Sequence, residues 1–416
     1  MTIRKKIIRV FVLEDIKGSI EKGKQEFFWA KNNMPIITKI IKKYKNKKIL
    51  EMFDLGMCLH ITKETAVLVM GLKQIGANIF LCSANPLSTQ DHIVSLLKQK
   101  EIMVYGKKGE TIQTFYNNMD IVLDKKPDII IDDGGEFHNK ALKKKYKIIG
   151  GTEETTSGIN RLKTWSKKNL ITYPIIGVNQ SNTKYLFDNR YGTGQSSIEG
   201  ILRTTGILLA GKRIIICGYG WVGKGIAAFL KGSGAKIIIT EINAVRALEA
   251  FMDGFEVKPI CETTPFGDLY ITCTGQIRVI RSEHIEKMKN GVILCNAGHF
   301  DVEIDINYLN NEDSHPLIIR KNLKCYKING KKIYLLSEGR VINLVGGDGN
   351  PPEIMALSFA NQLLSIIYIS VHSKKLENRI YNVPKKIEDE ISRLALQSFD
   401  IKIDSITQEQ ENYFYY

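Results

Sequence analysis

Short apolar runs alternate along the chain with segments in which apolar positions recur at helical spacing. The runs are rich in β-branched residues and lack a polar face, at residues 128–131, 175–178, 213–216 and 236–240. The helical patterns between such runs include residues 64–76, 222–230 and 245–252. Strands that are apolar throughout are covered on both faces, which is typical of parallel sheets flanked by helices. The pattern predicts an α/β fold with two doubly wound parallel-sheet domains and a small C-terminal segment.

The strands and helices fall into two series, from about residue 50 to 180 and from about 190 to 345. A turn-rich stretch of glycines and prolines follows, and a long apolar helical pattern then covers residues 353–370. We expect that helix to return to the first domain, so that the chain crosses between the domains twice. The predicted boundaries are residues 1–184 and 352–384 for the first domain, 185–351 for the second and 385–416 for the C-terminal segment.

Composition narrows the class of protein. Of 416 residues, 44% are hydrophobic and 25% are charged, which excludes a disordered or collagen-like chain. We find neither the run of ~20 apolar residues that a membrane span requires nor a secretory signal pattern, so we predict a cytoplasmic protein with no membrane partner. The seven cysteines are scattered without a Cys-x-x-Cys pair. Their distribution predicts a reducing compartment and no metal site.

The chain carries 59 Lys and Arg against 44 Asp and Glu, a net charge of +15. A basic protein can bind nucleic acid or an anionic surface. The lysines, however, form short clusters such as residues 143–145, and no nucleic-acid motif accompanies them. We therefore predict a lysine-rich solvated surface and no nucleic-acid partner.

A glycine motif predicts a dinucleotide site. Gly218-x-Gly220-x-x-Gly223 lies between a predicted strand and a predicted helix, and the next strand ends at Glu241, 18 residues later. This context is the Rossmann fingerprint, in which a diphosphate lies at the helix N-terminus and the acidic residue binds the adenosine ribose. Glu241 therefore predicts NAD. Arg246 could accommodate the 2′-phosphate of NADP, but we interpret it as a surface residue.

Other polar motifs follow the predicted strands in a fixed order along the chain. They are residues 58–66 (CLHITKETA), 88–91 (STQD), 132–135 (DDGG), 153–158 (EETTSG), 183–192 (TKYLFDNRYG), 298–301 (GHFD) and 337–344 (SEGRVINL). Together with the glycine motif, they resemble the S-adenosyl-L-homocysteine hydrolase family over nearly the whole chain. The resemblance is to an archaeal and thermophile branch of the family with a short C-terminus.

The resemblance implies an enzyme with tightly bound NAD that hydrolyses S-adenosyl-L-homocysteine reversibly to adenosine and L-homocysteine. In the family, oxidation of the ribose 3′-hydroxyl acidifies the C4′ proton, and homocysteine then leaves from C5′. Water adds, and reduction at C3′ gives adenosine. The cofactor carries the redox step, while the protein orients the substrate and transfers protons. The resemblance also implies a homotetramer or homodimer.

The resemblance assigns three sets of site residues. The catalytic set is His60, Asp133, Glu154, Lys184, Asp188 and His299. The substrate-binding set is Thr62, Glu64, Asp133, Glu154, Lys184, Asp188 and Asn350. The cofactor-binding set is Thr155, Thr156, Ser157, Asn189, Gly218, Gly220, Trp221, Val222, Gly223, Glu241, Arg246, Thr274, Ala297, Gly298, His299 and Asn343.

Within these sets, the family implies that Lys184 and Asp188 act on the 3′-hydroxyl, and a buried lysine can have a pKa low enough to be a base. It implies C4′ proton transfer for His60 and Asp133, and water handling for His299. Taken singly, each residue also has a structural interpretation. For example, Asp133 suits a turn, and Lys184 with Asp188 suits an exposed helical ion pair.

The sequence departs from the family at several positions. Asn350 replaces a histidine near the adenine, Thr193 replaces a cysteine near the nicotinamide, and Trp221 replaces an aspartate. Three other activities are therefore also considered. An S-inosyl-L-homocysteine hydrolase is opposed by Glu64, whose carboxylate suits an amino group. A NAD-binding pseudo-enzyme and a 2-hydroxyacid-type dehydrogenase are the remaining two.

Overall fold

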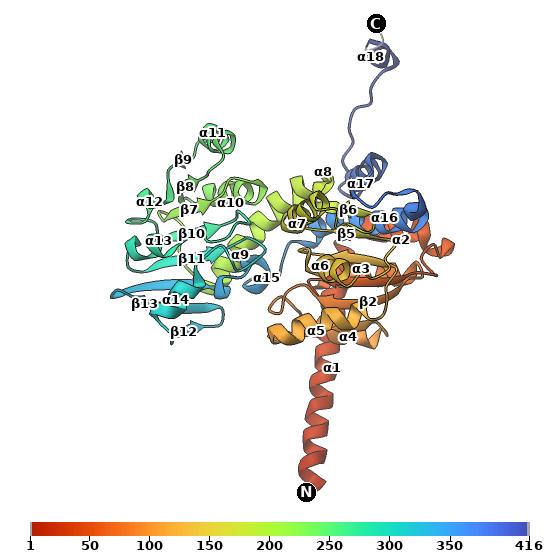
Figure 1. The fold of residues 1–416 in the computed structure, drawn as a ribbon, viewed down its shortest axis with the longest axis horizontal. Helices are drawn as coiled ribbons and strands as arrows, with labels where there is room; N and C mark the ends of the chain where they lie inside the picture. The colour runs from red at the N-terminus through yellow and green to blue at the C-terminus, as the bar shows by residue number, and fades with distance from the viewer. Residues whose placement is uncertain (1, 414–416) are drawn as a thin grey trace.

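The computed structural model describes residues 2–413, with side chains from residue 15 onward. Met1 and residues 414–416, which belong to the predicted ranges 1–184 and 385–416, lie outside the described residues. Two sheets lie side by side, each flanked by helices (Figure 1). The α/β fold class is thus confirmed.

The first sheet is parallel throughout, in the order β15-β6-β5-β4-β1-β2-β3. Its strands are β1 (Asp54–Leu59), β2 (Asn78–Ser83), β3 (Met103–Tyr105), β4 (Ile129–Asp132), β5 (Gly150–Glu153), β6 (Ile175–Gly177) and β15 (Ile380–Asn382). The helices around it are α1 (Thr2–Asn32), α2 (Pro35–Tyr44), η1 (Lys45–Lys47), α3 (Lys63–Gln74), α4 (Asp91–Gln99), α5 (Ile112–Leu123), α6 (Glu136–Lys143), α7 (Thr156–Lys167), η2 (Val178–Gln180), α8 (Asn182–Lys184), α16 (Pro352–His372), η5 (Ser373–Lys375) and α17 (Lys385–Ser398).

The second sheet has the order β12-β13-β14-β11-β10-β7-β8-β9. Its strands are β7 (Arg213–Cys217), β8 (Lys236–Thr240), β9 (Glu256–Val257), β10 (Leu269–Thr272), β11 (Val292–Asn296), β12 (Leu317–Arg320), β13 (Leu323–Ile328) and β14 (Lys331–Leu336). Its helices are η3 (Tyr185–Gly192), α9 (Thr193–Thr205), α10 (Trp221–Lys231), α11 (Ala244–Met252), α12 (Ile260–Thr263), α13 (Ser282–Lys287), α14 (Ile306–Glu312), η4 (Ser337–Gly339) and α15 (Ile342–Val345).

One edge of the second sheet differs from the purely parallel arrangement expected from the sequence. β12, β13 and β14 pair antiparallel with one another, while β14 joins β11 in parallel. Asn329 and Gly330 connect β13 to β14 with φ of 50° and 75°. Positive φ at both central residues is the geometry of a type I′ turn, whose twist suits a two-residue hairpin.

The chain crosses between the two sheets twice, as predicted. η3 and α9 lead into the second sheet, and α16 returns to pack on α2, α3 and β5 of the first. By length and composition the segment of α16 and η5 (residues 352–375) could cross a membrane, but its most apolar window, with a mean hydropathy of 1.7, is 72% buried in the protein. Its apolar sequence is therefore that of a core helix. The N-terminal part of α1 and the whole of α18 (Gln408–Tyr413) project away from the body at opposite ends (Figure 1), while the rest of α1 packs on α3 and α4.

Candidate active site

A cavity of about 1080 Å³ lies at the carboxyl ends of the central strands of both sheets. The strand order reverses between β1 and β4 in the first sheet and between β7 and β10 in the second. Ligands of doubly wound folds bind at such reversals. The predicted residues that line the cavity are His60, Thr62, Glu64, Asp133, Glu154, Thr155, Thr156, Ser157, Lys184, Asp188, Asn189, Gly218, Gly220, Trp221, Val222, Glu241, Arg246, Thr274, Ala297, Gly298, His299, Asn343 and Asn350. Of the predicted residues, Gly223 alone does not line it.

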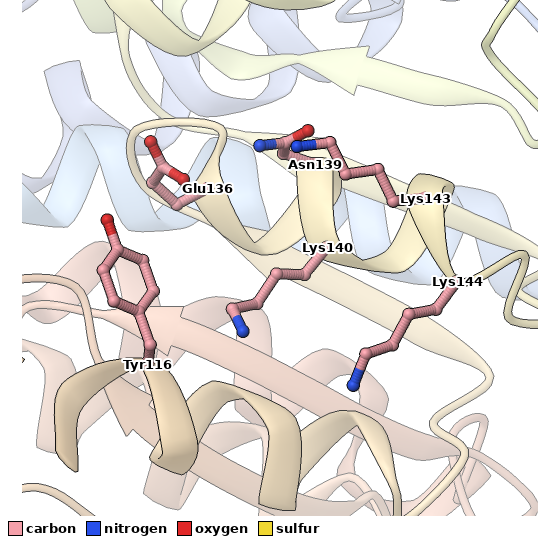
Figure 2. A pocket seen from close by; sticks show the side chains of 6 residues that line it. All are labelled: Tyr116, Glu136, Asn139, Lys140, Lys143 and Lys144. Atoms are coloured by element: carbon pink, nitrogen blue, oxygen red, sulfur yellow. The ribbon is translucent and has the colours of Figure 1, made fainter. Parts of the chain in front are cut away.

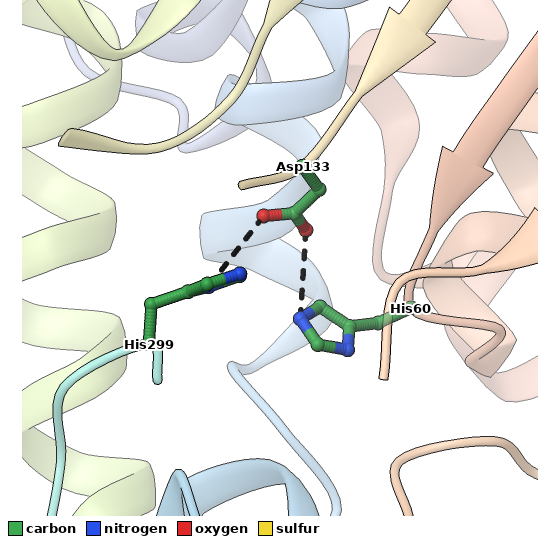
Figure 3. A group of neighbouring side chains, drawn as sticks. All are labelled: His60, Asp133 and His299. Atoms are coloured by element: carbon green, nitrogen blue, oxygen red, sulfur yellow. Dashed lines mark ion pairs between the residues drawn. The ribbon is translucent and has the colours of Figure 1, made fainter. Parts of the chain in front are cut away.

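Two histidines flank one aspartate where the sheets face each other (Figure 3). Asp133 follows β4, and its Oδ2 lies 3.6 Å from Nε2 of His60, which follows β1. Its Oδ1 lies 3.9 Å from Nδ1 of His299, which comes from the second sheet after β11. Gly134 makes room for this contact, because a Cβ there would come within 2.4 Å of Nε2 of His299.

The hydrogen bonds around His60 define its tautomer. The Ser88 hydroxyl donates to the backbone oxygen of Asn85 (3.1 Å), so its oxygen accepts from Nδ1–H of His60 (2.7 Å). Nε2 is left with a lone pair that faces Asp133. Burial lowers the pKa of His60 and of His299 to about 4 and raises the pKa of Asp133. Both imidazoles are therefore neutral, and a proton can pass between Asp133 and His60.

Lys184 lies among carboxylates at the crossing into the second sheet. Its Nζ is 3.4 Å from Oδ2 of Asp188, 3.6 Å from Oε1 of Glu154 and 2.8 Å from Oδ1 of Asn189. Burial alone would lower the pKa of Lys184, but Asp188, Glu154 and Asp133 outweigh it and raise that pKa. The expectation of a lysine with a lowered pKa is therefore wrong for the ligand-free protein, where Lys184 is an ammonium and the proton acceptor has to be a carboxylate.

Glu154 follows β5 and is almost completely buried. Its Oε2 accepts from Nε2 of Gln362 (2.6 Å), whereas its Oε1 has no hydrogen-bond partner among the described residues. Burial raises the pKa of Glu154 to about 8. A ligand hydroxyl that donates to Oε1 would satisfy this carboxyl group.

The N-terminus of α3 provides a second unsatisfied acceptor. Thr62 caps the helix by accepting from the backbone N–H of Thr65. Glu64 is 2% exposed, its Oε1 has no hydrogen-bond partner among the described residues, and burial raises its pKa. Met355 and Phe359 of α16, which sequence analysis missed, line the same cavity with apolar surface.

The glycine turn fits a dinucleotide diphosphate. A Cβ on Gly220 would approach protein atoms no closer than 4.0 Å, so this glycine leaves open space at the start of α10. A Cβ on Gly223 would come within 2.0 Å of the Gly218 oxygen, so Gly223 allows the helix to pack on the turn. Trp221 and Val222 begin α10. This is the arrangement in which helix N–H groups receive a diphosphate.

Glu241 directly follows β8, at the position where a ribose is bound in this fold. Its carboxylate accepts from the backbone N–H groups of Tyr219 (2.7 Å), Ile242 (2.7 Å) and Asn243 (3.0 Å). Partial burial raises its pKa, but these hydrogen bonds lower it overall, so the group is ionised. Arg246 is exposed on α11 and lines the same end of the cavity.

Backbone and amide groups line the other end of the predicted cofactor site. Thr155 caps α7, and Thr156 and Ser157 form its first turn. Oδ1 of Asn343 is buried without a hydrogen-bond partner among the described residues, which suits the amide N–H of a carboxamide ligand.

Sequence analysis missed Glu303, which is 1% exposed. It accepts from the backbone N–H groups of Thr274 (2.9 Å) and Gly275 (2.9 Å) and so fixes their loop.

A carboxyl pair beneath the site was also missed. Asp132 and Glu153 are register partners on β4 and β5. Asp132 accepts from the Asp133 N–H (2.8 Å), and Glu153 accepts from the N–H groups of Gly134 (3.0 Å) and Thr155 (2.9 Å). Burial raises the pKa of Asp132 to about 7 and that of Glu153 as well. The signal available in the sequence was that each predicted acid, Asp133 and Glu154, directly follows another acid.

Two clusters place potential metal ligands within 4.8 Å of one another: His60, Asp133 and His299, and Asp132, His138 and Glu153. In the second, both ring nitrogens of His138 are hydrogen-bonded, to Tyr173 and to the Thr152 oxygen. A separate hollow of about 390 Å³ lies between α5 and α6 (Figure 2). Lys140 and Lys144, which line it, both pair with Asp120. This one carboxylate compensates only one of the two positive charges that it contacts.

Comparison with known proteins identifies the family. Residues 10–146 match the model of S-adenosyl-L-homocysteine hydrolase, and residues 189–349 match the model of its NAD binding domain. The chain is 48% identical to an adenosylhomocysteinase of Sulfurisphaera tokodaii, over 94% of this chain and 95% of the relative. It is 46% identical to an S-inosyl-L-homocysteine hydrolase of Methanocaldococcus jannaschii, over 94% and 96%. The chain therefore belongs to the S-adenosyl-L-homocysteine hydrolase family, and its cofactor is NAD.

Proposed function

We propose that this enzyme catalyses the reversible, NAD-dependent hydrolysis of S-adenosyl-L-homocysteine to adenosine and L-homocysteine. The observation that carries the proposal is the position of two titratable clusters in one cavity beside the glycine turn. Lys184, Asp188 and Glu154 form one cluster, and His60, Asp133 and His299 form the other.

Bound NAD supplies reversible hydride transfer at C3′ of the ribose. Asp188 takes the proton of the 3′-hydroxyl, and the Lys184 ammonium stabilises the developing negative charge on that oxygen. Oε1 of Glu154 accepts a hydrogen bond from the ribose. The lone pair on Nε2 of His60 receives the C4′ proton, with Asp133 as its exchange partner, and His299 orients the water that adds at C5′.

Release of homocysteine thiol from S-adenosyl-L-homocysteine tests the proposal. We expect thiol release without net accumulation of NADH, because the 3′ position is reduced again in each turnover. Absence of thiol release from both the adenosyl and the inosyl compound while NAD is bound would identify a pseudo-enzyme. NADH that accumulates stoichiometrically with substrate would identify a dehydrogenase instead.

The inosyl compound is the second candidate, favoured by the raised pKa of Glu64. An ionised Glu64 accepts from the amino group of adenine, whereas a protonated Glu64 can donate to the carbonyl of hypoxanthine. We expect kcat/KM for the adenosyl compound, divided by that for the inosyl compound, to rise with pH as Glu64 ionises. A Glu64→Gln variant, whose amide presents both a donor and an acceptor, would make that ratio independent of pH.

We also propose that residues 1–184 and 352–384 form the substrate-binding domain, and that residues 185–351 form the NAD-binding domain. Residues 385–416 would form an oligomerisation segment of a homotetramer or homodimer. Exposed apolar side chains at Phe399, Ile401 and Ile403 support this last role. The described cysteines are all free, which supports a cytoplasmic location. Light scattering of the full chain and of a chain ending at Ser398 would test the assembly.

A further inference from the structure

The side-chain amide of Asn350 is fully hydrogen-bonded within the protein. Its Nδ2 donates to Oδ1 of Asp188 (2.7 Å) and to Oγ1 of Thr193 (3.2 Å). Its Oδ1 accepts from Oγ of Ser196 (2.7 Å) and from Nδ2 of Asn343 (3.1 Å). An amide has two N–H groups and two lone pairs on its oxygen, so its entire capacity is used. No donor or acceptor of this amide is left to bind the edge of a purine.

These contacts fix which way the amide points. In the opposite orientation Oδ1 of Asn350 would lie against the Asp188 carboxylate, and both oxygens would be acceptors. Gly192 provides the necessary space, because a Cβ there would come within 3.1 Å of Cγ of Asn350. The N–H of Asn350 is therefore directed at Asp188.

Asp188 is held from both sides. Its second oxygen, Oδ2, accepts from the hydroxyl of Ser358 on α16 and lies 3.4 Å from Nζ of Lys184. Asp188 is 4% exposed, so few orientations are open to it once both oxygens are engaged. Asn350 and Ser358 belong to the second crossing and α16, whereas Asp188 belongs to the first crossing.

We propose that Asn350 is a positioning residue that holds the Asp188 carboxylate toward the ribose 3′-hydroxyl, instead of a residue that binds the purine. The inference rests on the proposed function, in which Asp188 takes that proton. The same amide also holds Asn343, whose free Oδ1 suits the carboxamide of the cofactor. Asn350 therefore links the substrate end of the cavity to its cofactor end.

An Asn350→Asp variant tests the contact, because it keeps the shape and replaces the N–H donor with an oxygen. The charged group in contact with this position is Asp188, and the charged groups that act on Asp188 in turn are Lys184, Glu154 and Asp133. Two adjacent carboxyls share a proton at low pH, and the protonated Asp at position 350 can still donate to Asp188. At high pH both ionise and repel. We expect kcat relative to the unmodified enzyme to fall about tenfold or more between about pH 6 and pH 8.5.

Asn310→Asp is the matched control. Oδ1 of Asn310 accepts from the hydroxyl of Tyr326 on the far side of the second sheet, and a carboxylate retains this bond. Its pH profile should equal that of the unmodified enzyme. An Asn350→Ala variant should lower kcat with little change in KM. An increase in KM at constant kcat would instead identify a purine-binding residue, and an unchanged pH profile of Asn350→Asp would also overturn the proposal.

A measurement that needs no activity separates the inference from the proposed function. In the folded Asn350→Asp variant, the shared proton raises one carboxyl pKa above its unfolded value. Its stabilising contribution is present at low pH and is lost as pH rises. The unfolding midpoint of this variant, compared with that of the unmodified protein, should therefore fall as pH rises. A constant difference would refute the contact, whereas absence of thiol release by the unmodified enzyme would refute only the proposed function.

Discussion

At the scale of single residues, the cavity is distinguished by buried acceptor atoms that make no hydrogen bond within the described residues. Oε1 of Glu64, Oε1 of Glu154 and Oδ1 of Asn343 lack a hydrogen bond among the described residues. The ammonium of Lys63 lies 3.5 Å from the Glu64 atom, and that of Lys184 lies 3.6 Å from the Glu154 atom, so only Oδ1 of Asn343 carries the full cost of an unpaired buried atom, about 1–3 kcal/mol. All three are acceptors when the two carboxyl groups are ionised, and the amino group, the ribose hydroxyls and the carboxamide of the proposed ligands are donors. The protein is thus built to be completed by ligands that donate hydrogen bonds.

Glu154 provides a test of this interpretation. Its pKa of about 8 means that the empty site holds a protonated carboxyl at neutral pH. A ribose hydroxyl that donates to it favours the ionised form, so the affinity for adenosine should rise as pH approaches 8. The change is at most about tenfold per pH unit. Calorimetric titration between about pH 6 and 8.5 would measure it.

In a Glu154→Gln variant this pH dependence should disappear and the affinity should be lower throughout. Glu390→Gln is the control. Glu390 lies on α17, pairs with Lys43 of α2 and is outside the cavity. It should retain the slope of the unmodified protein. If Glu154→Gln also retained that slope, another group would be responsible for it.

Most of the polar residues that line the cavity were predicted from the sequence, whereas its apolar residues on α16 and the residues that support the polar ones were not. His60, Asp133 and Glu154 occupy recognisable motifs, and all three line the cavity. Asp132 and Glu303 contact backbone N–H groups instead. The sequence alone does not show whether an acidic residue accepts hydrogen bonds from the backbone N–H groups of a loop, because that depends on which strand lies beside it. The protonation of Lys184 also depends on such neighbours.

At the scale of elements, the strands and helices with clear apolar patterns were predicted to within a few residues of their observed ends. The apolar run at 236–240 coincides with β8, and the helical pattern at 245–252 with α11 (Ala244–Met252). The hairpin of β13 and β14 was missed although Asn329-Gly330 is its signal. In α16, Ser358, Asn361 and Gln362 lie at helical spacing within an apolar sequence. These polar residues share one face, and their contacts with the first crossing and Glu154 depend on tertiary packing.

The glycine motif at the start of α10 contains one glycine that the ligand requires, Gly220, and one that the fold requires, Gly223. We expect Gly220→Ala to leave the unfolding midpoint of the NAD-free protein nearly unchanged, because the added Cβ meets open space. The same methyl group would occupy the approach to the diphosphate and lower NAD affinity about tenfold or more. Gly223→Ala should instead destabilise the NAD-free protein by about 1–3 kcal/mol through its clash with Gly218. Thermal unfolding and NAD titration would distinguish the two effects, and equal loss of stability in both variants would contradict this assignment.

At the scale of the whole molecule, the site depends on both sheets. The strand reversal of the first sheet provides His60 and Asp133, and the reversal of the second provides the glycine turn. His299 comes from the second sheet and reaches Asp133 of the first. The residues that would bind the substrate and those that would bind the cofactor therefore line one cavity and contact each other. This arrangement predicts that the two ligands bind cooperatively.

3′-Deoxyadenosine measures this cooperativity without chemistry, because it lacks the hydroxyl that would be oxidised. We expect it to bind NAD-loaded protein about 5-fold or more tightly than NAD-free protein, within the usual range of coupling free energies of ~1–3 kcal/mol. By linkage, it should tighten NAD binding by the same factor. In Gly220→Ala, at NAD concentrations that saturate the unmodified protein but not the variant, the nucleoside affinity should stay near its NAD-free value. Equal affinity of the unmodified protein with and without NAD, measured by equilibrium dialysis, would show that the two halves of the cavity act independently.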